Sequence, residues 1–197
     1  ALSLVFNRLE PEASQTRVDT LLEDIRAGRI SGDGVLAARR GDRLVGAVFA
    51  QTQVGRTAVA WPPSIVAGEP DRTLDLLMEA ILGRLAEENV RVVHVVLDFS
   101  TPEETDLVSR GGFRWLADLI YLVSETRHFP TAQPEGPLEF ETYAPANHHR
   151  LAAIVDATYE HSLDCPQLNG VRRIEDILSG YQASGGFRPE LWMIFRH

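Results

Sequence analysis

Residues 57–85 constrain the fold more than any other stretch of this sequence, because a short strand-like segment leads directly into a strongly amphipathic one. The second segment predicts a helix, since its apolar residues recur with the spacing of one helical face. These residues are Leu74, Leu77, Met78, Ile81, Leu82 and Leu85. A strand that runs into a helix N-terminus exposes N–H groups at one turn, where α/β proteins often bind phosphate.

The rest of the chain predicts an α/β fold of the α+β kind, with a mixed sheet. A strand–helix–strand crossover over residues 57–97 makes part of the sheet parallel, and a hairpin turn at residues 40–43 makes the rest antiparallel. Strands are predicted at residues 2–9, 35–39, 44–51, 57–61, 90–97 and 116–124, and the apolar run 90–97 is expected to be buried on both faces. Helices are predicted over residues 14–28, 74–85 and 101–110.

The pattern restarts after a segment rich in Pro and Gly at residues 128–137, which reads as a linker. We therefore expect a first domain at residues 1–127 and a second unit at residues 138–197. The second unit predicts strand, helix, helix and strand, at residues 138–143, 147–159, 171–181 and 191–196. About 60 residues bury little core on their own, so this unit is expected either to pack on the first domain or to be the opening part of a longer domain.

Composition excludes several classes of function. The net charge of −9 argues against nucleic-acid or anionic-membrane partners, which need a positive field. No apolar run approaches the roughly 20 residues of a membrane span, and a single cysteine excludes an internal disulfide framework, so a cytoplasmic location is expected. All 19 basic residues are arginine, which excludes a Walker A lysine and a Schiff-base lysine.

The segment LVSRGGFR at residues 107–114, followed by a predicted strand, is similar to the end of motif B in the GNAT (GCN5-related N-acetyltransferase) family. The order of elements over the first 125 residues also resembles that family. The restart at Leu138 resembles the opening of a second GNAT domain. The whole chain thus resembles the N-terminal part of a tandem GNAT protein with an incomplete second domain.

This resemblance implies acetyl-CoA as cofactor. In the family, the turn after the fourth strand follows the pattern R/Q-x-x-G-x-G/A and wraps the pyrophosphate, and the pantetheine arm lies where the fourth and fifth strands separate. The matching turn here is residues 69–74. The positions that the resemblance assigns to the cofactor are Ile65, Val66, Ala67, Arg72, Thr73, Leu74 and Thr101.

The sequence departs from this pattern at almost every position. Both glycines are missing, Pro70 lacks an N–H, and Glu69 and Asp71 bring negative charge to a place where phosphate would bind. The residues at 62 and 63 are both proline, which removes two more donors, and Val108 replaces the tyrosine that often serves as general acid in the family. Arg72 is the one attractive group in a turn that is therefore expected to be degenerate.

The acceptor site of such a protein is expected at the loop that follows the first helix of the second unit. Glu160 and His161 are weak candidates for acid–base catalysis, and the catalytic residue stays unknown. Tyr159, Asp164 and Asn169 are candidates for substrate contact, although this loop is also rich in turn-forming residues. No metal site is expected, because the neighbouring residues His148 and His149 point to different sides of a helix.

Two functions follow as hypotheses. The first is part of an acetyl-CoA-dependent N-acetyltransferase, in which the first domain is a scaffold and the acceptor is a small-molecule or peptide amine. The alternative is a non-catalytic GNAT-like module for binding or oligomerisation, for example as a homodimer. The missing glycines at residues 69–74 favour the alternative.

Overall fold

The computed structural model describes residues 1–97, 101–119, 122–129, 131–132, 139–163 and 165–196. The chain divides into two compact units, unit 1 over Ala1–Arg114 and unit 2 over Trp115–His197. The mixed α/β class expected from the sequence is confirmed. The predicted domain limits stay a prediction, since most of the linker at residues 128–137 lies outside the described residues.

Unit 1 is built on a four-stranded sheet with the strand order β1-β2-β3-β4. The strands are β1 (Val35–Arg40), β2 (Arg43–Gln53), β3 (Thr57–Ile65) and β4 (Val92–His94). Strands β1, β2 and β3 pair antiparallel, and β3 and β4 pair parallel. The predicted crossover is therefore present, with its connecting helix between β3 and β4.

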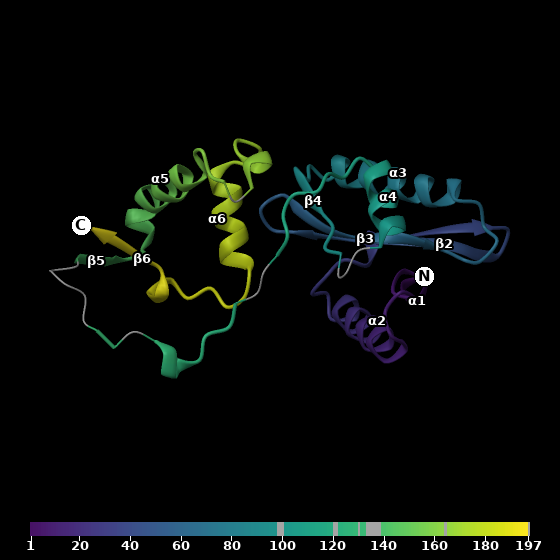
Figure 1. Ribbon diagram of the computed structural model, residues 1–197, viewed down its shortest axis with the longest axis horizontal. Coiled ribbons are helices and arrows are strands. Elements are labelled where there is room, and N and C mark those ends of the chain that lie inside the picture. The colour runs from purple at the N-terminus through teal and green to yellow at the C-terminus, as the bar shows by residue number, and fades with distance from the viewer. Residues whose placement is uncertain (98–100, 120–121, 130, 133–138, 164, 197) are drawn as a thin grey trace. The chain divides into compact units, whose positions relative to one another are not determined.

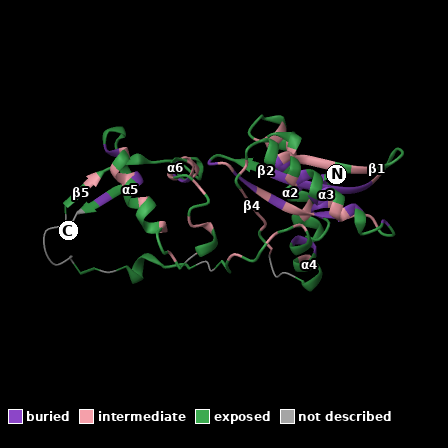
Figure 2. Cartoon of the chain, turned by 90° about the horizontal axis from the view of Figure 1, so that it is seen from above, coloured by how far each residue is buried: buried purple, intermediate pink, exposed green. Residues whose placement is uncertain are grey.

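Helices cover both faces of this sheet (Figure 1). They are α1 (Leu2–Val5), α2 (Pro11–Arg26), α3 (Arg72–Glu87) and α4 (Pro102–Arg110). Alternate residues of β2 serve the two faces: Ala47 and Phe49 pack with α1 and α2, and Val48 and Ala50 pack with α3. The buried residues of unit 1 follow this sheet in Figure 2.

The strand predicted at residues 2–9 is wrong, because this segment begins with α1. Leu2, Val5 and Phe6 are buried together, and their spacing matches one face of a helix. They join Val18 and Phe49 in one apolar cluster. Because these residues are buried against the sheet and α2, the segment forms a helix and not a strand.

Strand β3 contains an irregularity at its two prolines. Ala47 pairs with Ser64 and Phe49 pairs with Trp61, so two residues of β3 lie opposite one residue of β2. These two residues are Pro62 and Pro63, which have no N–H to donate to the ladder. The bulge lets β3 continue to Ile65 despite the missing donors.

Two predicted strands are shorter or missing. Only Val92–His94 of the predicted strand 90–97 forms β4, and these residues are half-buried and not covered on both faces. The predicted strand 116–124 is wrong for its described residues 116–119 and 122–124, which form no strand. Leu122 and Val123 are 91% and 93% exposed, so this apolar segment has no partner strand within the described part of the chain.

Unit 2 has the predicted order of strand, helix, helix and strand. Its elements are β5 (Glu139–Thr142), α5 (His148–Tyr159), α6 (Ile174–Ala183) and β6 (Met193–Arg196). Strands β5 and β6 pair antiparallel. Ile177, Leu178 and Ile194 are buried, whereas Phe140 and Phe195 make an edge-to-face contact at an exposed face of the β5–β6 sheet.

Short 3-10 helices complete the described structure. They lie at Gly32–Gly34, Thr126–His128, Pro145–Asn147, Pro166–Leu168 and Pro189–Leu191. Among the described residues, no helix is both long and apolar enough to cross a membrane.

Candidate functional site

The turn between β3 and α3 is the first candidate site, and some of the N–H donors in the turn and in the first residues of α3 already have partners within the protein. The N–H of Val66 donates to the carbonyl of Val45 at 3.0 Å, and the N–H of Glu69 donates to the carbonyl of Val66 at 3.2 Å. The N–H of Thr73 donates to the carbonyl of Pro70 at 2.9 Å. These groups are therefore engaged within the protein and do not point at a ligand.

Glu69 closes this turn with its own carboxylate. Its side chain is only 3% exposed. Nη2 of Arg40 lies 2.7 Å from its Oε1, Nε of Arg40 lies 3.0 Å from its Oε2, and the hydroxyl of Thr73 donates to Oε1 at 2.6 Å. A fixed negative charge thus occupies the helix start where an incoming phosphate would need a positive field.

These contacts stabilise the charged form of Glu69. The hydrogen bonds from Arg40 lower the pKa of the carboxyl group below its ordinary value, and Thr73 acts in the same direction. Burial opposes this change but does not overcome it. The carboxylate therefore stays ionised at neutral pH, and the residues of the turn do not fit the pyrophosphate of acetyl-CoA.

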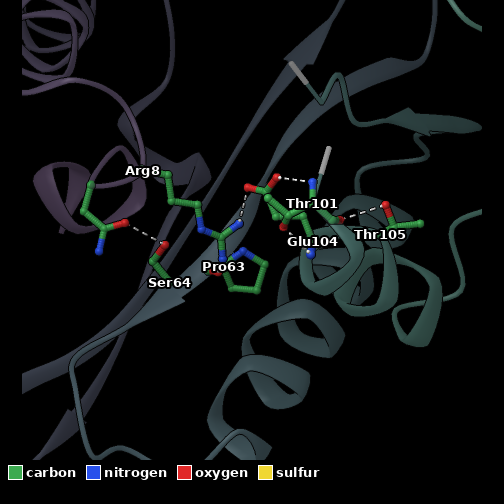
Figure 3. A network of polar contacts seen from close by, with 7 residues as sticks. Arg8, Pro63, Ser64, Thr101, Glu104 and Thr105 are labelled. Atoms are coloured by element: carbon green, nitrogen blue, oxygen red, sulfur yellow. Dashed lines mark hydrogen bonds and ion pairs between the residues drawn. The ribbon is translucent and has the colours of Figure 1, made fainter. Parts of the chain in front are cut away.

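The second part of the site is the space beside β3 beyond the end of its pairing with β4. The parallel ladder ends at the pair Val59–His94, whereas β3 continues to Ile65. Figure 3 shows that Arg8 reaches this region from the segment between α1 and α2. Its Nη1 lies 3.1 Å from Oε1 of Glu104, and its Nη2 donates to the carbonyl of Pro63 at 3.2 Å.

Helix α4 begins at this bridge. Thr101 caps α4, because its hydroxyl accepts from the N–H of Glu104 at 3.2 Å and the carboxylate of Glu104 accepts from the N–H of Thr101 at 3.3 Å (Figure 3). This reciprocal pair is a capping box. Glu104 thus contacts both the helix start and Arg8, and Arg8 joins the N-terminal segment to α4 and to the backbone of β3 where the resemblance places a pantetheine arm.

The residues predicted for cofactor binding are spread over this region. Ile65 ends β3, Ala67 lies exposed in the turn, and Arg72 is exposed at the first residue of α3. Thr73 is buried and bound to Glu69, as described above. The structure therefore brings most of them to one end of α3, and Arg72 is the one that presents a positive charge to solvent.

The residues predicted for the acceptor site lie at and after the end of α5. Glu160 and His161 are both exposed, and His161 has a positive φ of 56°. Asp164 lies outside the described residues. The Oδ1 atom of Asn169 is buried and has no hydrogen-bond partner among the described residues.

Tyr159 contacts Tyr181 of α6 through a hydrogen bond of 2.6 Å between the two hydroxyl oxygens. Burial raises the pKa of Tyr159 to about 12, and the hydrogen bond with Tyr181 adds to this effect. The phenol is consequently a poor proton donor at neutral pH. This pair joins the last turn of α5 to α6. Tyr159 therefore has a structural contact, in addition to the substrate contact predicted for it.

Sequence reasoning missed a second chain of polar groups in unit 2. The hydroxyl of Tyr143 lies 3.0 Å from Nδ1 of His148, and Nε2 of His148 lies 2.9 Å from Oε2 of Glu175. When Nε2 carries the proton, it donates to Glu175, and Nδ1 accepts from Tyr143. Gln182 donates to the same Tyr143 oxygen at 3.4 Å. These contacts connect β5 and the starts of α5 and α6.

Only one of the missed contacts had a signal in the sequence. The Thr101-x-x-Glu104 pattern is that of a capping box and would have shown that Glu104 is more than a solvated acid. Arg40 and Glu69 are separated by 29 residues, and Arg8 and Glu104 by 96, so no local pattern predicts either pair.

The described residues contain no group of three or more His, Cys, Asp or Glu side chains that is placed to hold a metal ion. His149 is exposed, and His148 is bound to Tyr143 and Glu175 as described above. Comparison with known proteins found no family model and no curated protein that matches this sequence.

Proposed function

We propose that this chain is part of an acetyl-CoA-dependent N-acetyltransferase, and that unit 1 serves in it as a scaffold that does not bind the cofactor. Support for the acetyltransferase half comes from the order of elements in unit 1. A parallel pair, β3 and β4, is joined through α3, and the two strands stop pairing after Val59 while β3 runs on to Ile65. The GNAT-like motif at residues 107–114 follows in α4 and the turn after it.

The observation that carries the scaffold role is the buried carboxylate of Glu69. This carboxylate is ionised, paired with Arg40 and held by Thr73, so an anion already lies at the positive end of α3. The bridge from Arg8 to Glu104 and to the carbonyl of Pro63 supports the same role, because it occupies polar groups beside β3. The acceptor in this proposal is a small-molecule or peptide amine.

Titration calorimetry with acetyl-CoA tests the scaffold half. We expect no heat of acetyl-CoA binding for this chain, and none for the variants Glu160→Gln and Arg72→Gln. The variant Glu69→Gln keeps the shape of the side chain but removes the charge that repels phosphate, so it separates electrostatic from steric exclusion. Micromolar binding by the unmodified chain, abolished by Arg72→Gln, would overturn the scaffold role.

The acetyltransferase half needs a separate test on the complete gene product. A thermal shift with acetyl-CoA, compared with the same shift for desulfo-CoA and for adenosine alone, is expected to show stabilisation by the first two ligands. If none of the ligands shifts the melting temperature of the complete protein, the acetyltransferase proposal fails even when the scaffold result is as expected.

A second candidate function is favoured by one feature of unit 2. Phe140, Met193 and Phe195 lie on the same face of the β5–β6 pair and are 56%, 48% and 59% exposed. An exposed apolar sheet face of this kind suits a non-catalytic module that binds or forms a homodimer. Sedimentation velocity of the chain and of Phe140→Asp tests it, and a monomer at all concentrations would exclude the homodimer.

A further inference from the structure

Unit 1 has a pocket on the β1–β2 side of α3, with a volume of about 290 Å³. Its apolar surface comes from both the hairpin and the helix, through Ala38, Val45, Leu76 and Leu77. Val45 and Leu77 are buried core residues, whereas Leu76 is 49% exposed. The pocket therefore combines buried and exposed apolar residues, and its volume lies just below the range of about 300–1,000 Å³ for organic-ligand sites.

Two arginines line the same pocket, and the structure fixes the position of each. Nη1 of Arg39 donates to the carbonyl of Asp42 at 3.0 Å, which ties its guanidinium to the hairpin turn. Arg40 is fixed by Glu69 through Nε and Nη2. Both side chains thus lose part of their conformational freedom before any ligand binds, which favours binding.

The geometry of Arg40 leaves donors for an external anion. A guanidinium group offers two edges that match a carboxylate, one through Nε and Nη2 and one through Nη1 and Nη2. Glu69 occupies the first edge, with Nε–Oε2 and Nη2–Oε1 distances of 3.0 and 2.7 Å. The Nη1 edge makes no hydrogen bond to another described residue, and the side chain of Arg40 is 60% exposed.

The charges that face the pocket favour an anion. Arg39 and Arg40 carry two positive charges, and Glu69 carries the one negative charge among the lining residues. Arg43, at the start of β2, is close enough to Glu69 to help lower its pKa and so adds positive potential nearby. This local excess is the reverse of the net charge of −9 of the whole chain.

We infer that this pocket binds a small carboxylate with an apolar body. The hydrocarbon part packs on Val45, Leu76 and Leu77, the carboxylate accepts hydrogen bonds from the Nη1 edge of Arg40, and Arg39 adds positive charge to the lining. The site lies on the hairpin side of α3 and requires no acyl transfer and no acetyl-CoA. It goes beyond the function proposed above, although Glu69 and Thr73 belong both to its lining and to the turn after β3.

Octanoate is the probe, and 1-octanol is its uncharged counterpart with the same hydrocarbon body. Binding to the whole chain is measured at neutral pH by NMR, from the methyl signals of Val45, Leu76 and Leu77. We expect octanoate to shift these signals and to bind about tenfold more tightly than 1-octanol. The two compounds share the apolar contact, and the difference corresponds to one charge-assisted hydrogen bond to the carboxylate. Equal affinity for the two compounds, or shifts confined to other methyl groups, would overturn the inference.

Two exposed substitutions test the two halves of the site without disturbing the core. Arg39→Gln removes one charge and Leu76→Gln removes part of the apolar wall, and each is expected to weaken octanoate binding about fivefold. The matched controls are Arg91→Gln, an exposed arginine outside the lining residues, and Val54→Gln, which replaces a 57% exposed apolar residue in a turn. Equal losses in the controls and in the pocket variants would show non-specific binding and would refute the site.

Discussion

The guanidinium of Arg40 at the end of β1 holds the carboxylate of Glu69 at the start of α3 through two parallel contacts, Nε–Oε2 at 3.0 Å and Nη2–Oε1 at 2.7 Å. This pair joins the edge strand of the sheet to the crossover helix. Our two proposals rest on this pair: the carboxylate opposes anion binding in the turn after β3, and the remaining edge of Arg40 is offered to an anion in the hairpin pocket.

Glu69→Gln is expected to lower stability in a pH-dependent way. Because the folded protein lowers the pKa of Glu69 below its ordinary value of 4.5, the stabilisation by the charged carboxylate is complete above that value and is lost as the pH falls through the folded-state pKa. Urea unfolding of both proteins from about pH 3 to pH 7 measures the difference. It should be largest at neutral pH and shrink in acid.

The control for this experiment is Glu79→Gln, which removes the same charge from an exposed position of α3. If the stability difference between the unmodified chain and Glu69→Gln does not change with pH, the carboxylate does not have the contacts described here.

The bridge between Arg8 and Glu104 is expected to show measurable coupling. Their side chains are 38% and 21% exposed, so the pair is partly screened by water, and a double-mutant cycle with Arg8→Gln and Glu104→Gln should give a coupling energy of about 0.5–1 kcal/mol. Glutamine at position 104 still completes the capping box, so the cycle isolates the bridge. Arg188 and Glu190 form an exposed local pair, and a cycle there should give a smaller value.

Gly34 and Gly83 provide opposite outcomes for the same substitution. A Cβ at Gly34 would lie 1.9 Å from the carbonyl oxygen of Ala50, so Gly34→Ala should cost about 2 kcal/mol or more of the free energy of unfolding. A Cβ at Gly83 meets nothing within 4 Å, and Gly83→Ala in α3 should stabilise by about 0.5–1 kcal/mol. Thermal unfolding of both variants measures the two changes in stability. If Gly34→Ala leaves the stability unchanged, β2 does not run beside this glycine.

Tyr159 is expected to ionise later than an ordinary tyrosine. Absorbance at alkaline pH, compared between the unmodified chain and Tyr159→Phe, should assign to it a pKa of about 12. Tyr181→Phe removes one cause but leaves burial, so the pKa of Tyr159 should fall and still stay above 10. Since the unfolded chain ionises first, this residue makes folding less favourable as the pH rises from about 10 to 12. Tyr143→Phe is the control that should leave Tyr159 unchanged.

The parts of the fold that could be predicted are those in which a local period is long and unambiguous. Helix α3 has four apolar residues of its predicted face buried, namely Leu77, Met78, Ile81 and Leu85. The hairpin of β1 and β2 follows from turn residues, and the start of α4 follows from the proline and acids of its first turn. Residues 2–9, in contrast, are too few for the apolar spacing to distinguish a strand from a helix. Contacts with Phe49 and α2 favour the helix α1 there.

The candidate site was harder to predict, because its decisive contacts join residues far apart in the sequence. The missing glycines of the turn at residues 69–74 indicated that phosphate would not bind there. They did not indicate that Glu69 would turn inward to Arg40, which depends on how far β1 extends beside the start of α3. The same limit applies to His148. Its neighbour His149 suggests a histidine pair in the sequence, whereas in the structure His148 contacts Glu175, 27 residues away.

The two prolines of β3 also bear on how this protein avoids self-association. Residues 60–65 of β3 extend beyond the last pair with β4, and no other strand pairs with that edge within the described part of the chain. A strand edge of this kind would ordinarily serve as a template for strands of other molecules. Pro62 and Pro63 withhold two amide donors from that stretch, and Arg8 occupies the carbonyl of Pro63. The feature that weakens β3 as a partner for a ligand thus protects the sheet against edge-to-edge aggregation.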